Sequence, residues 1–140
     1  MRRRLLLDTG PLVAYLKRQD EFHNWVMGEL ARIEPPLLTC EPVIVEACFL
    51  VRNVYPGSGA VISLLNRGLL QIAFDLQAEA GPIEQLMNRY QSVPMSCADA
   101  CLVRMAELSP GSEMLTLDSD FLIYRKNRNQ TIPVIMPQNE

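Results

Sequence analysis

The sequence predicts an α/β fold of three layers, in which helices cover both faces of a short parallel central sheet. Apolar runs of three to six residues alternate along the chain with segments of helical hydrophobic spacing, as in βαβ units. The runs are apolar at nearly every position, which is typical of parallel strands buried on both faces. No repeat or linker interrupts the pattern, and 140 residues suit one domain, which we assign to residues 1–140.

The first elements follow directly from turn and capping residues. Leu5–Leu7 is a short apolar run that ends at the turn-forming residues 8–11, so we expect a buried strand there. Pro11 suits the first turn of a helix, which we place at Leu12–Lys17. Asp20 is expected to cap a second helix, and two prolines at 35–36 end it. The apolar face of that helix contains Phe22, Val26 and Leu30.

The middle of the chain repeats this alternation. Leu37–Thr39 is expected to form a second strand, and Pro42 to open a helix that runs to about Asn53. Residues 56–59 form a loop rich in glycine and serine, after which we expect a helix over Ala60–Asn66.

The last half supplies three strands and two helices. Leu69–Phe74 is the third expected strand, and Asp75 caps a helix that runs through Tyr90. Ser96–Leu108 is the last helix. Glu113–Leu117 and Ile132–Ile135 are the fourth and fifth expected strands.

Composition and charge place the chain among ordinary globular proteins. Hydrophobic residues make up 49% of the chain, and no apolar stretch is long enough to span a membrane. Residues 1–7 imitate the start of an export signal, but Asp8 ends the apolar run after three residues, so we expect a cytoplasmic protein without membrane contact. The four cysteines are expected to be buried hydrophobic residues. Zinc at Cys97 and Cys101 would have only His23 to help complete it.

Two aspartates directly follow strands that should be neighbours. Asp8 comes after the first strand and Asp118 after the fourth. In a doubly wound sheet of strand order 3-2-1-4-5, these strands lie side by side, and ligands bind beyond their carboxyl ends. We therefore expect Asp8 and Asp118 to face each other across a crevice.

Two further acids lie in apolar helices. Glu46 belongs to the run Val43–Val51, which is apolar nearly all round, and an ionised carboxylate buried there requires a cation or strong donors. Asp99 lies near the start of the last helix. Together with Asp8 and Asp118, these residues form one candidate site.

Each acid also has a purely structural interpretation, which the sequence leaves open. Asp8 and Asp118 could simply cap turns, and Ser96-x-x-Asp99 fits a capping box. Glu46 could lie on an exposed stripe or pair with Arg104. The hypothesis of a shared site depends on the fold bringing the four carboxylates to one edge.

Carboxylates without a histidine cluster favour Mg²⁺ or Mn²⁺ over zinc or copper. Such a site lowers the pKa of a bound water and neutralises phosphoryl charge, so a phosphodiester is the substrate that best uses it. The net charge of −3 argues against a nucleic-acid partner. With four acids assigned to one site, however, the remaining acids and bases nearly balance. The bases cluster at residues 2–4, 17–18 and 125–128.

The sequence resembles a PIN domain, and specifically the VapC-like ribonuclease toxins of toxin–antitoxin pairs. The similar segments are residues 7–14, 44–47, 98–100 and 116–121, which together extend over nearly the whole chain. The resemblance implies catalytic and metal-binding roles for Asp8, Glu46, Asp99 and Asp118, with Asp120 as an accessory metal ligand. Thr9 and Thr116 would hold hydrogen bonds to a ligand or a metal-bound water.

The function that the resemblance implies is Mg²⁺- or Mn²⁺-dependent endoribonuclease activity on RNA, restrained by an antitoxin protein, in a homodimer. A non-catalytic RNA-binding module and a housekeeping RNA-processing nuclease without an antitoxin are the alternatives. Single Asp-Thr-Gly at 8–10 does not suit an aspartic protease, which pairs two such aspartates in an all-β fold. His23 and Trp25 are expected to be structural, with a contact to RNA as the alternative for each, and Tyr55, Val61 and Leu65 are candidates for the dimer interface.

Overall fold

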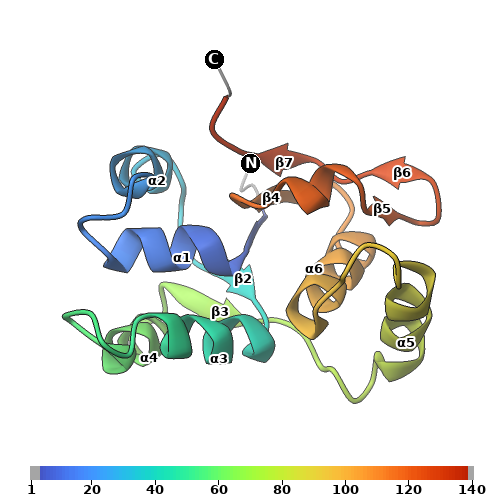
Figure 1. The fold of residues 1–140 in the computed structure, drawn as a ribbon, viewed down its shortest axis with the longest axis horizontal. Helices are drawn as coiled ribbons and strands as arrows, with labels where there is room; N and C mark the ends of the chain where they lie inside the picture. Colours follow the sequence, from blue (N-terminus) through green and yellow to red (C-terminus); the bar gives the residue numbers. More distant parts are fainter. Residues whose placement is uncertain (1–3, 139–140) are drawn as a thin grey trace.

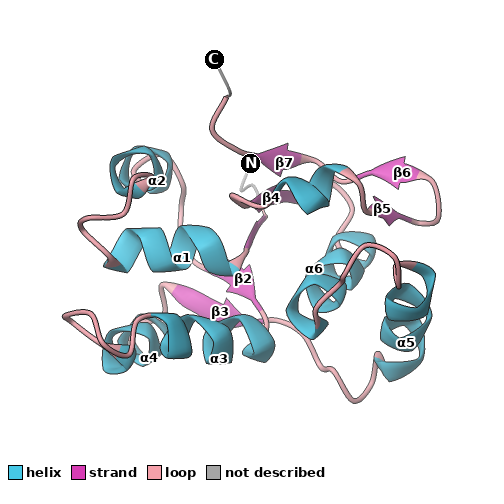
Figure 2. Cartoon of the chain, in the orientation of Figure 1, coloured by secondary structure: helices cyan, strands magenta, loops and turns pink. Residues whose placement is uncertain are grey.

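The computed structural model describes residues 4–138, and its centre is a parallel sheet of five strands (Figures 1 and 2). The strand order is β3-β2-β1-β4-β7. The strands of this sheet are β1 (Leu5–Leu7), β2 (Leu37–Thr39), β3 (Leu70–Ile72), β4 (Glu113–Leu115) and β7 (Val134–Ile135). The expected fold class and strand order are confirmed, because β7 is the fifth of the strands that the sequence predicts.

Helices lie on both sides of the sheet, which gives the three layers. In Figure 1, α1 and α2 lie to the left of the sheet and α5 and α6 to the right. Helix α3 packs against α1, α4 and α6. The helices are α1 (Thr9–Leu16), α2 (His23–Leu30), α3 (Glu41–Leu50), α4 (Ser58–Asn66), α5 (Ala80–Arg89) and α6 (Cys97–Leu108).

The register of β1 on β4 brings the ends of these two strands level. Leu5 pairs with Glu113 and Leu7 with Leu115, and the amide of Asp8 donates to the carbonyl of Leu115 over 3.1 Å. Asp8 therefore leaves β1 beside the residue that follows β4. The two central strands are almost completely buried, as leucine-rich strands covered on both faces must be.

Helix α3 is buried on one face only rather than all round, which corrects one prediction. Val43, Ile44 and Ala47 face the core, whereas Val45 and Phe49 are 69% and 60% exposed. The sequence does not distinguish an exposed apolar residue from a buried one, since both fit an apolar run. The argument that Glu46 must be a buried carboxylate is therefore wrong, and the side chain is exposed.

Two predicted helix caps form turns that precede their helices. The side chain of Asp20 accepts from the amide of Phe22 over 2.8 Å, and α2 begins only at His23. Likewise Asp75 accepts from the amide of Ala78, and α5 begins at Ala80. Both aspartates cap the backbone as expected, but the chain makes a turn before the helix starts.

The segment after β4 contains structure that the sequence analysis did not predict. A 3₁₀ helix, η1 (Ser119–Leu122), is followed by a hairpin of β5 (Arg125–Lys126) and β6 (Gln130–Thr131). Its loop holds Asn127 and Arg128 at φ values of 49° and 73°. Asparagine adopts this left-handed conformation readily but arginine rarely does, so Asn127 was the only turn signal in the pair.

The structure also bears on the predictions about membrane segments, cysteines, zinc and the dimer interface. Within residues 4–138 no helix is long and apolar enough to cross a membrane. Cys40 and Cys101 are buried and contact each other. His23 lies on α2 and Cys97 on α6, on different sides of the sheet, so they do not form the zinc site considered above (Figure 1). Val61, a candidate interface residue, lies in the core, whereas Tyr55 is 93% exposed.

Candidate functional site

Asp8 is a buried carboxylate at the point where β1 ends and α1 begins. It is 6% exposed and is the N-cap residue of α1. Its Oδ1 accepts from the amide of Thr9, and its Oδ2 accepts from the hydroxyl of Thr116, both over 2.7 Å. The expected strand-to-helix junction thus holds the side chain in one orientation by two hydrogen bonds.

Thr116 links Asp8 to Asp118. The Thr116 hydroxyl is fully buried, donates to Asp8 and accepts from the amide of Asp118 over 3.0 Å. Asp118 in turn accepts from the amide of Asp120 over 2.9 Å and so caps η1. The structure therefore places Asp8 and Asp118 together at the ends of neighbouring strands, as the strand order predicts.

Asp99 reaches the same region from the first turn of α6. The expected capping box is present: the Ser96 hydroxyl accepts from the amide of Asp99, and the Ser96 amide donates to Asp99 Oδ2 over 3.2 Å. The hydroxyl of Tyr124 also lies 3.2 Å from Asp99 Oδ2. Asp99 is thus a helix cap and a member of the carboxylate cluster at once.

The pKa values show that the three carboxylates interact. Burial raises the pKa of Asp8 to about 6; hydrogen bonds from Thr116 and Thr9 oppose this rise, and the charges of Asp99 and Asp118 add to it. Burial also raises the pKa of Asp99, as does the charge of Asp118. Like charges held this close are costly unless a cation offsets them.

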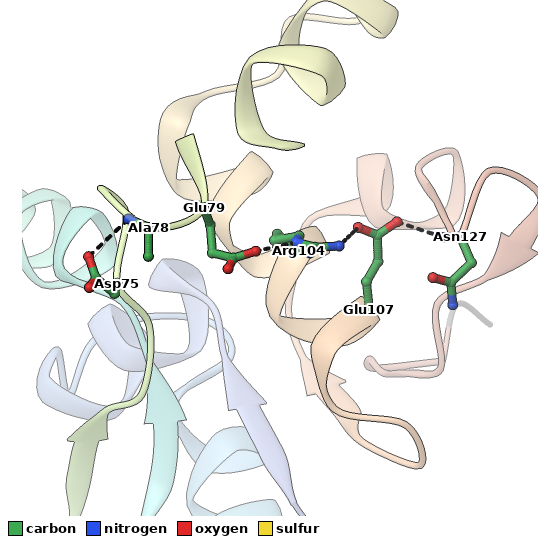
Figure 3. Close-up of polar contacts among 6 residues, drawn as sticks. All are labelled: Asp75, Ala78, Glu79, Arg104, Glu107 and Asn127. Atoms are coloured by element: carbon green, nitrogen blue, oxygen red, sulfur yellow. Dashed lines mark hydrogen bonds and ion pairs between the residues drawn. The ribbon is translucent and has the colours of Figure 1, made fainter. Parts of the chain in front are cut away.

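Glu46 lies at the edge of this region. It lines an open hollow of about 520 Å³ between α3 and the start of α6, together with Ser96, Cys97 and Ala98. The side chain is therefore next to the helix turn that carries Asp99, although it is exposed rather than buried. The structural alternative of a pair with Arg104 is wrong, because Arg104 binds Glu79 and Glu107 (Figure 3).

The accessory residues occupy two different positions. Asp120 lies in η1, two positions after Asp118, which caps this helix. Burial and the charge of Asp99 raise the pKa of Tyr124, and the charge of Asp120 adds to this rise. Thr9 is 4% exposed, and its hydroxyl oxygen Oγ1 has no hydrogen-bond partner among residues 4–138. A buried hydroxyl without a partner is unfavourable unless a ligand or water satisfies it.

Tyr124 is the site residue that the sequence analysis missed. Its ring is fully buried and packs edge-on against Phe121 and Tyr90, with ring centroids 5.3 Å and 5.1 Å away. These contacts aim its hydroxyl at Asp99, which lies 25 positions earlier in the chain. No local sequence pattern predicts such a contact. The only indication in the sequence is that Tyr124 is an aromatic residue soon after Asp118.

The ligand atoms of the cluster suit a hard cation. Its side chains offer carboxylate and hydroxyl oxygens, which suit Mg²⁺ or Mn²⁺. The unpartnered Thr9 hydroxyl beside Asp8 is consistent with a bound water or ligand there. As the side chains stand, no three His, Cys, Asp or Glu residues of the described chain lie close enough to coordinate one ion together.

No protein-family model matches this chain, and no curated protein matches it. The PIN-domain resemblance thus stays a prediction from the motifs. The fold and strand order agree with what that resemblance implies.

Proposed function

We propose that the protein is a Mg²⁺- or Mn²⁺-dependent endoribonuclease. The observation that carries this proposal is the gathering of Asp8, Asp99 and Asp118, from three separate segments, beyond the ends of β1 and β4. Among residues 4–138, no arginine or lysine forms an ion pair with any of them. A negative cluster that the fold maintains without its own counter-ion favours an external cation.

Asp8, Asp99 and Asp118 would move closer together to hold the metal, because the side chains as they stand are too far apart to coordinate one ion. Glu46 would lie at the rim, and Asp120 would be an accessory ligand. The metal would supply charge neutralisation at the scissile phosphate and a water of lowered pKa. Thr116 fixes the orientation of the Asp8 carboxylate, and Tyr124 fixes that of Asp99. The Thr9 hydroxyl, which has no hydrogen-bond partner among residues 4–138, would donate to the attacking water or to a phosphate oxygen. In-line attack would leave 5′-phosphate and 3′-hydroxyl ends.

RNA is the proposed substrate, and the resemblance to VapC-like toxins extends the proposal to its biology. An active ribonuclease is harmful to its own cell, so we propose a cognate antitoxin protein that blocks the acidic site. A homodimer and a cytoplasmic location are proposed on the same resemblance. A housekeeping nuclease would share the chemistry but would not need the inhibitor.

The direct test is incubation of the purified protein with mixed RNA in Mg²⁺, in Mn²⁺ and in EDTA. We expect cleavage only with metal, and a loss of about a hundredfold or more in Asp8→Asn, because that change removes a buried charge from the cluster. Asparagine should preserve the fold, since its oxygen still accepts from the Thr9 amide and its NH₂ group can donate to Thr116 Oγ1, so that only the proton of the Thr116 hydroxyl loses its acceptor. Asp75→Asn is the matched control, as Asp75 caps an exposed turn outside the site.

A second readout does not depend on finding the correct RNA. Metal bound to the folded state raises the melting temperature, and saturation at a hundred times the Kd adds about 2.7 kcal/mol. We expect Mg²⁺ or Mn²⁺ to stabilise the wild type and the Asp75→Asn control but not Asp8→Asn. Equal stabilisation of all three, with no RNA cleaved, would favour the non-catalytic alternative.

A further inference from the structure

A second hollow, of about 790 Å³, lies at the end of α1 that is farther from Asp8, beside the segment that follows α3. It separates the segment that follows α1 from the segment that follows α3. Lys17 and Arg18 line one wall with His23, and Tyr55 lies on the opposite wall. No acidic residue lines it within the part of the chain that the structure describes. We call it the basic groove.

We propose that the basic groove binds single-stranded RNA a few nucleotides away from the phosphate that is cleaved. This inference rests on the proposed nuclease function, because it assigns the groove to the same substrate. Neither Lys17 nor Arg18 has an ion-pair partner in residues 4–138, so both cations are available to phosphates. A protein of net charge −3 needs such local positive charge to hold RNA.

Aromatic side chains in and near the groove suit unpaired bases. Tyr55 is 93% exposed, so nearly the whole side chain is accessible to solvent, which is unusual for a large aromatic residue. Phe49 is 60% exposed, and the guanidinium of Arg52 lies 3.8 Å above the centre of its ring. Exposed aromatic faces combined with cations are the platforms on which single-stranded nucleic acids stack.

His23 adds a feature that favours RNA over DNA. Its Nδ1 lies 2.7 Å from the carbonyl of Ala14, and because a carbonyl only accepts, Nδ1 carries the proton. In the neutral ring Nε2 is then an acceptor. An acceptor in the wall of a phosphate-binding groove suits a ribose 2′-hydroxyl, which DNA lacks.

The course of α1 and α3 joins the groove to the acidic site. Helix α1 begins at Thr9 beside Asp8 and ends at Leu16 in the groove wall, a path of about 12 Å at 1.5 Å per residue. Along α3, Glu46 and Phe49 are three positions apart and so share one face, and Arg52 follows in the turn after the helix, with its guanidinium over the ring of Phe49. That face leads from the rim of the acidic site toward Tyr55. A few nucleotides would span the distance.

The test measures binding of a short fluorescent single-stranded RNA by anisotropy in EDTA, where no cleavage occurs. We expect the double variant Lys17→Ala/Arg18→Ala to bind about tenfold more weakly, and its salt dependence to lose about 1.4 units of slope for two phosphate contacts. Tyr55→Ala should weaken binding roughly tenfold without changing that slope, since it removes stacking. His23→Ala should reduce the ratio between the affinity for RNA and the affinity for DNA of the same sequence.

The control removes the same charge from a different surface, through Lys126→Ala/Arg128→Ala on the β5–β6 hairpin. Equal binding by the groove variants and the wild type, or no RNA binding by the wild type, overturns the proposal. Loss of self-association with unchanged RNA binding also overturns it, and assigns the groove to a second copy of the chain. RNA binding lost in the groove variants but not in the control supports the groove, even if no metal brings about cleavage. Metal-dependent cleavage with unaffected groove variants would instead leave the nuclease proposal standing alone.

Discussion

Helix α6 carries acidic residues near both ends, and only those near its C-terminal end form ion pairs in the described chain. Near its end, Glu107 binds Arg104, which also binds Glu79 over 2.6 Å, so that cluster contains its own cation (Figure 3). Near its start, Asp99 faces Asp8 and Asp118 without any basic partner in the described chain. The paired acids join α5, α6 and the β5–β6 hairpin. The unpaired acids hold charge together at a cost to stability, which is typical of a binding site.

Neutralising one acid at each end of α6 gives the largest expected contrast. Asp99→Asn should lower RNA cleavage about a hundredfold or more while the fold persists, because an asparagine oxygen still accepts from Ser96 and Tyr124. Glu107→Gln should leave cleavage nearly unchanged but lower the free energy of unfolding by about 1 kcal/mol, through a weaker bond to Arg104. Cleavage rates and urea unfolding of both variants measure this. Equal losses of activity would remove the distinction between the two ends.

The neighbouring positions of Asp8 and Asp118 were predictable because they depend on few assumptions. Each aspartate ends an apolar strand, and parallel sheets of this strand order place the two strands together. The capping box at Ser96 and Asp99 was also predictable from local sequence. What the sequence did not settle was whether a cap is only a cap. In this protein, Asp8, Asp99 and Asp118 all accept capping hydrogen bonds and still form a cluster.

Other parts of the site depend on contacts without a local pattern. The hydrogen bond between Tyr124 and Asp99 joins residues far apart in the chain, and the turn that follows Tyr124 places Arg128 in a conformation that arginine rarely adopts. The prediction that Glu46 is buried was wrong for a different reason. An apolar run predicts that a helix has a core face, but it does not reveal that Val45 and Phe49 lie outside that face.

The cost of the unpaired cluster should appear in the pH dependence of stability. The folded protein raises the pKa of Asp8 from 3.8 to about 6, so it binds this proton more tightly than the unfolded chain does. The contribution of Asp8 is fully favourable below pH 3.8 and is lost as the pH rises through 6. The shift of about two pKa units corresponds to ~3 kcal/mol.

Urea unfolding of the wild type and Asp8→Asn at acidic and at neutral pH, without metal, measures this difference. Relative to the wild type, Asp8→Asn should gain stability by up to about 3 kcal/mol between the two conditions. Glu107→Gln, from the cluster that contains its own cation, should show no such gain. A difference between wild type and Asp8→Asn that does not change with pH would mean that Asp8 is not a strained carboxylate.

The smallest expected effect comes from Tyr124, whose hydroxyl lies 3.2 Å from Asp99 Oδ2. Tyr124→Phe keeps the ring packing but removes a hydrogen bond that lowers the pKa of Asp99. We expect a loss of about 1 kcal/mol in unfolding free energy and a several-fold slower reaction. The acidic limb of the pH–rate profile should move to higher pH, because Asp99 then ionises less readily. Tyr90→Phe is the matched control, since its hydroxyl accepts from the amide of Arg125 and not from the site. If both variants shift the profile equally, the tyrosine only supports the fold. If only Tyr124→Phe shifts it, the hydroxyl tunes Asp99, and the unpaired end of α6 is arranged for chemistry rather than for stability.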